Sequence, residues 1–320
     1  MSNFSFRPAI RENVGLWINL VGGTGSGKTY TAMRLASGIS GGKPFAVIDT
    51  ENRRALHYAD QFKFHHAELR EPFTPDSYAE AILAADAAGY PVIVVDSGSH
   101  VWAGDGGMLD MQEAEFQRMG GRDTVKMSSW IKPKRQHKKM VSKLLQLRAH
   151  LILCLRAEEK IEMVKEDGKM IVRAKQSMTG KDGWIPICDK NLPFEATCSF
   201  LLLASNPGVP HPIKLQEQHK DIFPLSQAIT ENSGRSLAAW AAGGTPPTAD
   251  SAPPSAPAAA SGPSGVPDPL IVKARELAES GTEAYGTWFD ALTAEEQKKI
   301  GKRRHDELWA IAESFDRAAA

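Results

Sequence analysis

The sequence has few cysteines, no long apolar run and no excess of charge of either sign. Its three cysteines, Cys154, Cys188 and Cys198, show no C-x-x-C spacing, which argues against a disulfide framework or a structural zinc site and favours a reducing compartment. The N-terminal segment MSNFSFRPAIREN has no continuous apolar stretch, and nowhere do about 18 apolar residues follow one another. We therefore expect a cytoplasmic protein without an export signal or a membrane-spanning helix.

Charge is balanced over the whole chain, with 38 Lys and Arg residues against 38 Asp and Glu residues. No net field attracts nucleic acid or an anionic membrane, so any site for a polyanion must be local. Hydrophobic residues make up 42% of the chain and charged residues 24%, which is typical of globular proteins rather than disordered or fibrous ones. The length of 320 residues suits two domains of about 150 residues each, or one large and one small domain.

Proline, alanine and serine dominate residues 243–269, which hold 8 of the 20 prolines and no aromatic residue. Such a segment cannot bury enough apolar surface to fold, and it is typical of a semi-extended linker. The linker divides the chain into a core domain over residues 1–242 and a small module over residues 270–320.

The small module has the signals of a short helical bundle. Pro269 can begin a helix that Gly281 ends, and Thr293 with Glu296 forms a capping box. Four apolar residues then follow at helical spacing, namely Leu308, Ile311, Ala312 and Phe315. A module of this size is marginally stable alone, so we expect it to pack on the core or on a partner.

The core domain alternates short apolar runs with helical stretches. Four runs are rich in Val, Ile and Leu without strict alternation, at residues 16–21, 44–50, 91–97 and 149–156. Strands of this kind are buried on both faces, so an α/β fold with a mostly parallel central sheet and helices on both faces is predicted. Further on, Asp167-Gly168 between strand-like runs predicts a hairpin over residues 160–175, and residues 200–205 and 212–218 resemble further strands.

A glycine-rich segment directly follows the first apolar run. Residues 22–29 read GGTGSGKT and match G-x-x-x-x-G-K-[ST] between a predicted strand and a predicted helix, which is the context that this motif needs. A glycine-rich turn with an incidental lysine is the alternative. The backbone amides would surround a phosphate, Lys28 would reach the β- and γ-phosphates, and the Thr29 hydroxyl would bind Mg²⁺. The nucleotide-binding residues expected are Gly22, Gly23, Thr24, Gly25, Ser26, Gly27, Lys28, Thr29 and Tyr30.

Two carboxylates end apolar strands and suit the remaining roles at such a site. Asp96 ends the run PVIVVD and is the expected second magnesium ligand, the alternative being an aspartate that only caps a turn. Glu51 follows the run PFAVIDT at the edge of the sheet where ligands bind, and it is the expected base for the water that attacks the γ-phosphate. The alternative for Glu51 is the N-cap of a helix beginning near Asn52.

The order of these parts resembles the core of the RecA recombinase over about residues 10–240: the glycine-rich loop, then IDTE at residues 48–51, then VIVVDS at residues 92–97. More closely, the chain resembles the compact RecA-like proteins of bacteriophages that are often labelled AAA-domain ATPases. Residues 219–223 (HKDIF) and the helix-like segment 234–240 are similar to the end of that family's core.

The resemblance implies an ATP- and Mg²⁺-dependent homo-oligomer on single-stranded DNA in the host cytoplasm, acting in recombination, annealing or replication. It also implies a basic residue that reaches the γ-phosphate of a neighbouring subunit, for which Lys220 is the first match and Lys214 the second. The paired lysines, the long N-terminal helix and the large C-terminal domain of bacterial RecA are absent from this sequence. A single-strand-binding or replication protein is the partner expected for the C-terminal module.

A local basic surface is present despite the neutral whole. No Asp or Glu occurs between Thr124 and Ala157, and basic residues there would bind phosphates while Trp130 stacked a base. A solvated helix face is the alternative, and an ordinary exposed hairpin is the alternative for the basic residues of residues 160–175. The candidate nucleic-acid contacts are Trp130, Lys132, Lys134, Arg135, Lys138, Lys139, Lys165, Lys169 and Arg173.

The sequence therefore favours a DNA-associated ATPase of the RecA-like type over two alternatives. A small-molecule kinase would use the same loop but needs an acceptor pocket and an arginine-rich lid. A switch NTPase that acts through a protein partner would keep the loop but would not need the basic stretch.

Overall fold

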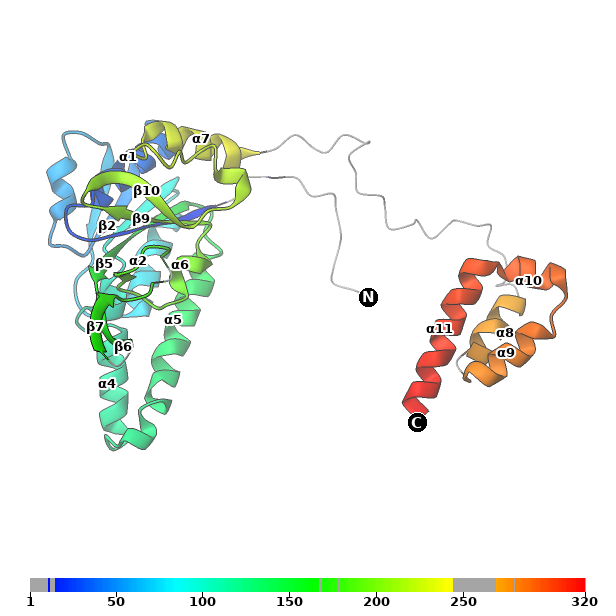
Figure 1. Cartoon of the computed structure of the whole chain (residues 1–320). Helices are drawn as coiled ribbons and strands as arrows, with labels where there is room; N and C mark the ends of the chain where they lie inside the picture. The colour runs from blue at the N-terminus through cyan, green and yellow to red at the C-terminus, as the bar shows by residue number, and fades with distance from the viewer. Residues whose placement is uncertain are drawn as a thin grey trace. The chain divides into compact units, whose positions relative to one another are not determined.

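The computed structural model describes residues 11, 15–166, 169–177, 179–243, 269–278 and 280–319 (Figure 1). It divides into two compact units, Met1–Pro246 and Pro247–Ala320. Most of the predicted linker, residues 244–268, and the predicted turn at Asp167 and Gly168 lie outside the described residues. No helix in the described ranges combines the length and the apolar content needed to cross a membrane.

The apolar runs of the first unit form the centre of one sheet with the order β10-β9-β1-β5-β4-β2-β3. All neighbouring strands from β9 to β3 run parallel, and β10 is antiparallel to β9 at the edge. The predicted α/β fold with a mostly parallel central sheet is thus confirmed. The strands are β1 (Trp17–Gly22), β2 (Phe45–Asp49), β3 (Phe64–Glu68), β4 (Val92–Asp96), β5 (His150–Glu159), β9 (Cys198–Leu203) and β10 (Asn206–Lys214).

Helices cover both faces of this sheet, as the absence of strict alternation in its strands requires. On one face, α1 (Lys28–Ser40) and α7 (Glu231–Ala242) bury Leu35 and Leu237 against strand residues such as Leu20. On the other face, α2 (Pro75–Ala87) and α5 (Ile131–Leu144) bury Ile82 and Met140. Figure 1 shows the two pairs of helices on opposite sides of the strands.

Two edge strands differ from the sequence prediction. The strand β3 was not predicted because its sequence, FHHAE, carries two histidines and only a few apolar residues. The strand expected over residues 212–218 instead begins at Asn206 and ends at Lys214. This strand contains three prolines, which hide the strand signal but are tolerated at the edge of a sheet, where fewer amide groups must pair.

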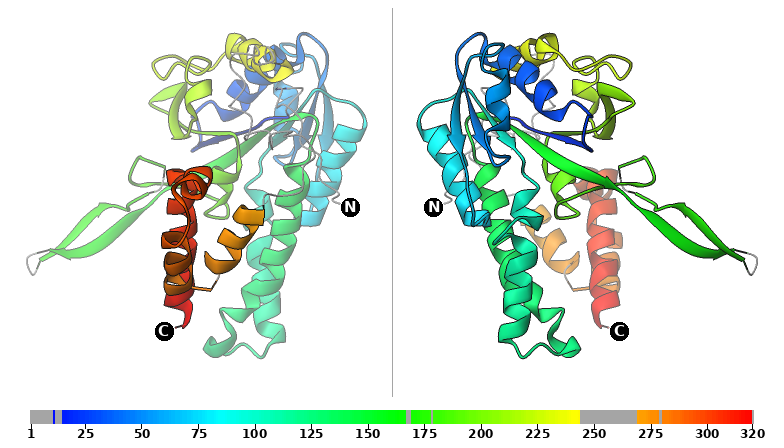
Figure 2. Two further views of the ribbon diagram at one scale, coloured as in Figure 1. Left: turned by 90° about the vertical axis from the view of Figure 1, so that its right-hand side faces the viewer. Right: turned by 90° about the vertical axis from the view of Figure 1, so that its left-hand side faces the viewer.

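Two hairpins extend from the first unit (Figure 2). One is helical: α3 (His100–Ala103) and α4 (Met108–Arg118) lead through short 3₁₀ turns at Asp123–Val125 and Ser128–Trp130 into α5. The other is a β-ribbon made of β6 (Ile161–Glu166) and β7 (Lys169–Ala174), in the region where the sequence predicts a hairpin. After this ribbon, β8 (Trp184–Pro186) pairs with the outer end of β5, and α6 (Leu192–Glu195) leads into β9.

The second unit is a bundle of helices with its own apolar core. Tyr285, Ile300 and Leu308 are among its buried residues. Thr293 and Glu296 form the predicted capping box at the start of α10. The helices of this unit are α8 (Pro269–Ala278), α9 (Thr282–Asp290), α10 (Ala294–Ile300) and α11 (Lys302–Ala319). The side chain of Phe315, expected in the core of the bundle, lies outside the described residues.

Candidate functional site

The glycine-rich loop joins the end of β1 to the start of α1. Gly25 and Gly27 have φ angles of 76° and 81°, a region that other residues enter only with strain. The Ser26 hydroxyl turns inward and donates to the Gly23 carbonyl at 2.7 Å, which closes the loop on itself. The loop therefore presents backbone amides and the N-terminus of a 13-residue helix, an arrangement that favours a bound anion.

Lys28 is the first residue of α1, and its side chain folds back over this loop. Its ammonium donates to the Gly23 carbonyl at 2.9 Å. Burial lowers the pKa of Lys28, while the nearby carboxyls of Asp96 and Glu51 act in the opposite direction. A partly desolvated cation beside the backbone amides of this loop is a strong partner for phosphate oxygens.

Thr29 and Asp96 meet at the base of the pocket. The Thr29 hydroxyl donates to the Asp96 carboxylate at 2.5 Å, and Asp96 is 6% exposed. Burial raises the pKa of Asp96 to about 6. A hydroxyl and a carboxylate are oxygen donors of the kind that Mg²⁺ prefers. Within the described ranges no three His, Cys, Asp or Glu side chains gather to hold a metal, so a cation here would complete its shell with nucleotide oxygens and water.

Glu51 lies just beyond the C-terminal end of β2, and two arginines hold its carboxylate. Arg156 of β5 donates through Nε at 2.9 Å and approaches with its terminal nitrogen at 2.8 Å, both to Oε1. Arg54 donates to Oε2 at 2.7 Å. The carboxylate does not cap a helix near Asn52, because the next helical turn, a 3₁₀ helix, spans Arg54–Tyr58. Its side chain is 11% exposed and lines the same pocket as Lys28.

Asp49 fixes the turn that carries Glu51. Its buried carboxylate accepts the backbone N–H of Glu51 at 2.7 Å and that of Ala55 at 2.9 Å. Two bonds from one fixed carboxylate hold the turn after β2, which would otherwise leave these amides without partners. Asp49 therefore sets the direction in which the Glu51 side chain leaves the sheet.

These groups surround one pocket of about 520 Å³, a size that suits a nucleotide. Tyr30 and Tyr58 form an aromatic wall at one end, with ring centroids 5.8 Å apart. The pocket brings together most of the residues predicted for phosphate and metal binding with the predicted base. Its lining is Gly22, Gly23, Thr24, Gly25, Gly27, Lys28, Thr29, Tyr30, Glu51, Arg54, Tyr58, Asp96, Arg156, Ala157 and Ile187.

Sequence reasoning missed five of these residues, namely Arg54, Tyr58, Arg156, Ala157 and Ile187. Arg156 had a usable signal, since it lies near the end of a predicted parallel strand, at the same sheet edge as Glu51 and Asp96. Arg54 and Tyr58 lie in a short 3₁₀ helix with no sequence pattern of its own. Their place in the pocket depends on the turn that Asp49 holds.

The two lysines matched to a subunit-bridging role lie outside this pocket. Lys220 is exposed and pairs with Glu217 at 2.6 Å. Lys214 donates to the carbonyls of Phe194 and Ala196, both at 2.6 Å, and so joins the end of β10 to the α6 segment. Any contact of Lys220 with a neighbouring subunit stays a prediction.

The predicted basic face is present on α5 and is exposed to solvent. Pro133, His137, Met140 and Leu144 turn inward, while the basic side chains turn outward. Trp130 stacks on Trp102, with centroids 5.6 Å apart and planes at 17°. Lys132 lies 3.9 Å from the Glu115 carboxylate. The exposed basic residues of this helix are Lys132, Lys134, Arg135, Lys138, Lys139 and Lys143.

The basic residues of the β-ribbon are arranged differently. Arg173 donates to the carboxylates of Glu162 at 2.9 Å and Glu166 at 3.2 Å, so its charge is largely balanced. Lys165 and Lys169 are exposed. The ribbon thus presents less free positive charge than its sequence indicates.

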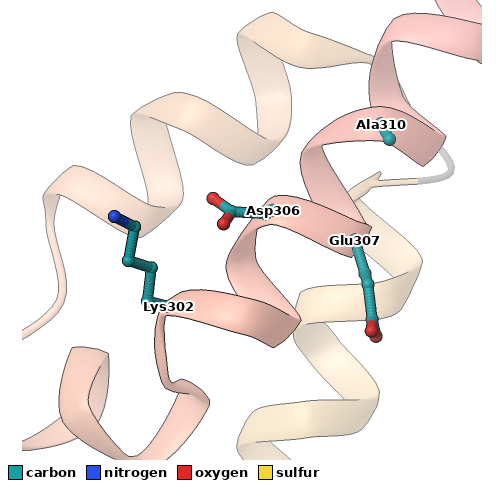
Figure 3. Close-up of a pocket in the computed structure, with 4 residues that line it drawn as sticks. All are labelled: Lys302, Asp306, Glu307 and Ala310. Atoms are coloured by element: carbon teal, nitrogen blue, oxygen red, sulfur yellow. The ribbon is translucent and has the colours of Figure 1, made fainter.

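The second unit carries a hollow of about 610 Å³ beside α11. Four exposed residues line it, and Figure 3 shows Glu307 pointing away from Lys302 and Asp306. Residues from a single helix give this hollow no enclosing wall and no convergent polar groups. The glycine-rich pocket of the first unit is therefore the candidate site.

One comparison with known proteins supports this assignment at the level of family. A family model described as an AAA domain matches residues 15–190. The search of curated proteins returned no match. Among solved structures, the chain is similar to the crystal structure of a KaiC-like protein from the hyperthermophilic archaeon Pyrococcus horikoshii, with 17% sequence identity and a TM-score of 0.32. That similarity covers 59% of this chain and 72% of the archaeal one.

Proposed function

Because this chain belongs to the AAA-domain family, we propose that it binds ATP with Mg²⁺, hydrolyses it, and does so in contact with single-stranded DNA. One observation supports the ATPase part above all: Lys28, Thr29, Asp96 and Glu51 line a single pocket next to the glycine-rich loop. The spacing of these groups suits a triphosphate, its cation and an attacking water.

Each side chain has one part in the proposed reaction. The loop amides and Lys28 bind the phosphates and offset their negative charge. Mg²⁺, held by Thr29 and Asp96, would neutralise charge that develops on the phosphate oxygens. Glu51 orients the water and accepts its proton, and Arg156 keeps the Glu51 carboxylate in the pocket. Tyr30 and Tyr58 offer aromatic faces to the base.

Two substitutions test the ATPase proposal. Lys28→Ala should weaken ATP binding and lower turnover by about 100-fold or more, since it removes the main side-chain cation facing the phosphates. Glu51→Gln should keep ATP binding while turnover falls about 100-fold, because the amide cannot accept a proton. Binding is measured by calorimetry and turnover by phosphate release. Near-normal hydrolysis in a folded Lys28→Ala protein would contradict the proposal.

The DNA part rests on the exposed basic face of α5, where Lys134, Arg135, Lys138 and Lys139 make no ion pair within the described ranges. In a chain without net charge, such a face is a local attraction for a phosphate backbone. We further propose that the protein works as a homo-oligomer of the bacteriophage RecA-like type in recombination, annealing or replication. The C-terminal unit would then recruit a single-strand-binding or replication protein.

Salt dependence tests the DNA part more sharply than affinity alone. Replacing Lys134, Arg135, Lys138 and Lys139 together by Gln should make the fall of log affinity with log salt less steep, by about 0.7 per lost contact. ATP turnover without DNA should stay near wild type, and its stimulation by single-stranded DNA should fall. An unchanged slope and unchanged affinity would contradict DNA binding at α5 and favour a switch that acts through a protein partner.

A further inference from the structure

The β6–β7 ribbon has one face that is almost entirely apolar. Residues paired across an antiparallel ribbon point to the same side, so the pairs of this face are Ile161 with Ala174, Met163 with Val172, and Lys165 with Met170. Ile161, Met163, Met170 and Val172 are 69%, 71%, 63% and 61% exposed. We call these six residues, together with Glu159, the apolar face of the ribbon.

The opposite face of the same ribbon is mostly polar, and its arginine is paired with two carboxylates. There, Arg173 bridges Glu162 and Glu166, and the partly buried Val164 and Ile171 lie between these charged residues. A two-stranded ribbon alone in water is marginally stable, and a third layer or strand is needed to support it. Figure 2 shows the ribbon projecting from the sheet of the first unit, with no described element of that unit laid along it. A clustered apolar surface of this kind marks a docking site.

Two charges mark the ends of the apolar face. Glu158 and Lys160 form an ion pair at 2.6 Å, so they share a side, and alternation along the strand places Glu159 on the other side with Ile161. Lys165 lies six residues further on the same face. Neither Glu159 nor Lys165 forms an ion pair within the described ranges. The face therefore has a negative end at its base and a positive end near its tip.

We propose that the apolar face docks on the apolar face of a second copy of this chain, with the two ribbons antiparallel about a two-fold axis. In this arrangement Lys165 of one copy lies opposite Glu159 of the other, twice over. Met163 then covers Ile161, and Val172 covers Ala174. The two ribbons form a small two-layer sheet with a layer spacing of about 10 Å, and the interface is isologous.

The chemistry of the face favours a second copy over a nucleic acid. Aliphatic side chains offer no base-stacking surface, and the single lysine of the face is balanced by one glutamate. A second copy would bury the apolar side chains and would pair each end charge with its opposite. Six-residue strands span only about 20 Å, so the interface is small and we expect weak, reversible dimers.

A charge swap tests the arrangement directly. Sedimentation velocity over a range of concentrations, without nucleotide or DNA, should show a monomer–dimer equilibrium for the full chain. Lys165→Glu and Glu159→Lys should each weaken the dimer about tenfold or more, because each places like charges opposite one another twice. The double variant carrying both changes should dimerise nearly as well as wild type. Failure of the double variant to recover dimerisation would overturn the proposed pairing.

A second pair of variants tests the apolar contact with a matched control. Met163→Thr with Val172→Thr should abolish dimers, and threonine keeps the strand propensity of the ribbon. Val164→Thr with Ile171→Thr makes the same kind of change on the opposite face and should leave the dimer intact.

Three results would overturn the proposal. The first is a wild-type chain that stays monomeric at all concentrations. The second is a dimer whose dissociation constant is unchanged by both pairs of threonine substitutions. The third is a dimer that both pairs weaken equally. A nucleic-acid face would behave in a further distinct way: Lys165→Glu would weaken binding to single-stranded DNA and Glu159→Lys would strengthen it, with no dimer in either case. That pattern would also overturn the proposal.

Discussion

Among single residues, Asp96 combines a binding role with a cost in stability. Its carboxyl is buried at the end of β4, and burial raises its pKa from an ordinary 3.8 to about 6. A raised folded-state pKa means that protonation stabilises the native chain. That stabilisation is complete below about pH 4 and is lost as the pH rises through about 6.

We predict that Asp96→Asn removes this pH dependence. Relative to the variant, the wild-type chain without nucleotide should lose about 3 kcal/mol of stability between pH 4 and pH 7, from a shift of about two pKa units. Urea unfolding at several pH values measures the difference. Because the amide is a poor magnesium ligand, the same variant should lose Mg²⁺-dependent turnover. A constant difference between the two proteins at all pH values would contradict the ionisation assigned to Asp96.

The two arginines on Glu51 allow a matched comparison. Arg156 contacts Oε1 with two nitrogens from a central strand, whereas Arg54 makes one contact and is 65% exposed. We predict that Arg156→Ala lowers kcat about tenfold, since Glu51 loses the partner that holds it in the pocket. Arg54→Ala should change kcat by less than about twofold, as expected of a surface ion pair. Steady-state phosphate release measures both, and equal effects would contradict the role given to Arg156.

Among the elements, α1 and α7 approach so closely that only glycine fits between them. A Cβ atom on Gly234 would overlap the carbonyl oxygen of Leu35 and would lie 2.9 Å from the Cα of Gly38. Replacing glycine by alanine in an exposed helix is usually favourable, because alanine is the better helix former. At Gly234 we expect alanine to lower the stability instead, because the atoms that its Cβ would meet belong to the backbone of α1 and cannot move aside.

We predict that Gly234→Ala destabilises the first unit by about 1–3 kcal/mol through overpacking. Ser236→Ala is the control, because Ser236 lies on the exposed side of the same helix and should be neutral or slightly stabilising. Thermal or urea unfolding separates the two outcomes. A stabilised Gly234→Ala protein would show that α7 can move away from α1 at little cost.

For the whole molecule, each of the two units has its own apolar core. We predict that a chain ending at Gly243 keeps its ATP turnover without DNA within about twofold of the full chain, because every residue of the pocket lies in the first unit. Phosphate release and the midpoint of thermal unfolding measure this. A large loss of turnover in the shortened chain would mean that the second unit supports the pocket.

The sequence by itself determined the α/β class, the central strands and the place of the glycine-rich loop. These signals are local: apolar runs, glycines at fixed spacing and carboxylates that end buried strands can be recognised without knowing their neighbours. Parallel strands place their carboxyl ends at one edge of the sheet, so Lys28, Glu51 and Asp96 were expected to lie near one another. The edge strands β3 and β10 lacked such signals because edges accept polar residues and proline.

Only the tertiary structure decided which partners these residues have. Glu51 and Arg156 are 105 residues apart, and they meet because β4 lies between β2 and β5 in the same sheet. Trp130, the candidate for stacking a base, packs against Trp102, a contact that the sequence did not indicate. The apolar face of the ribbon also depends on pairing, since strand register decides which side chains share a side. Such contacts depend on strand order and register, which no local pattern encodes.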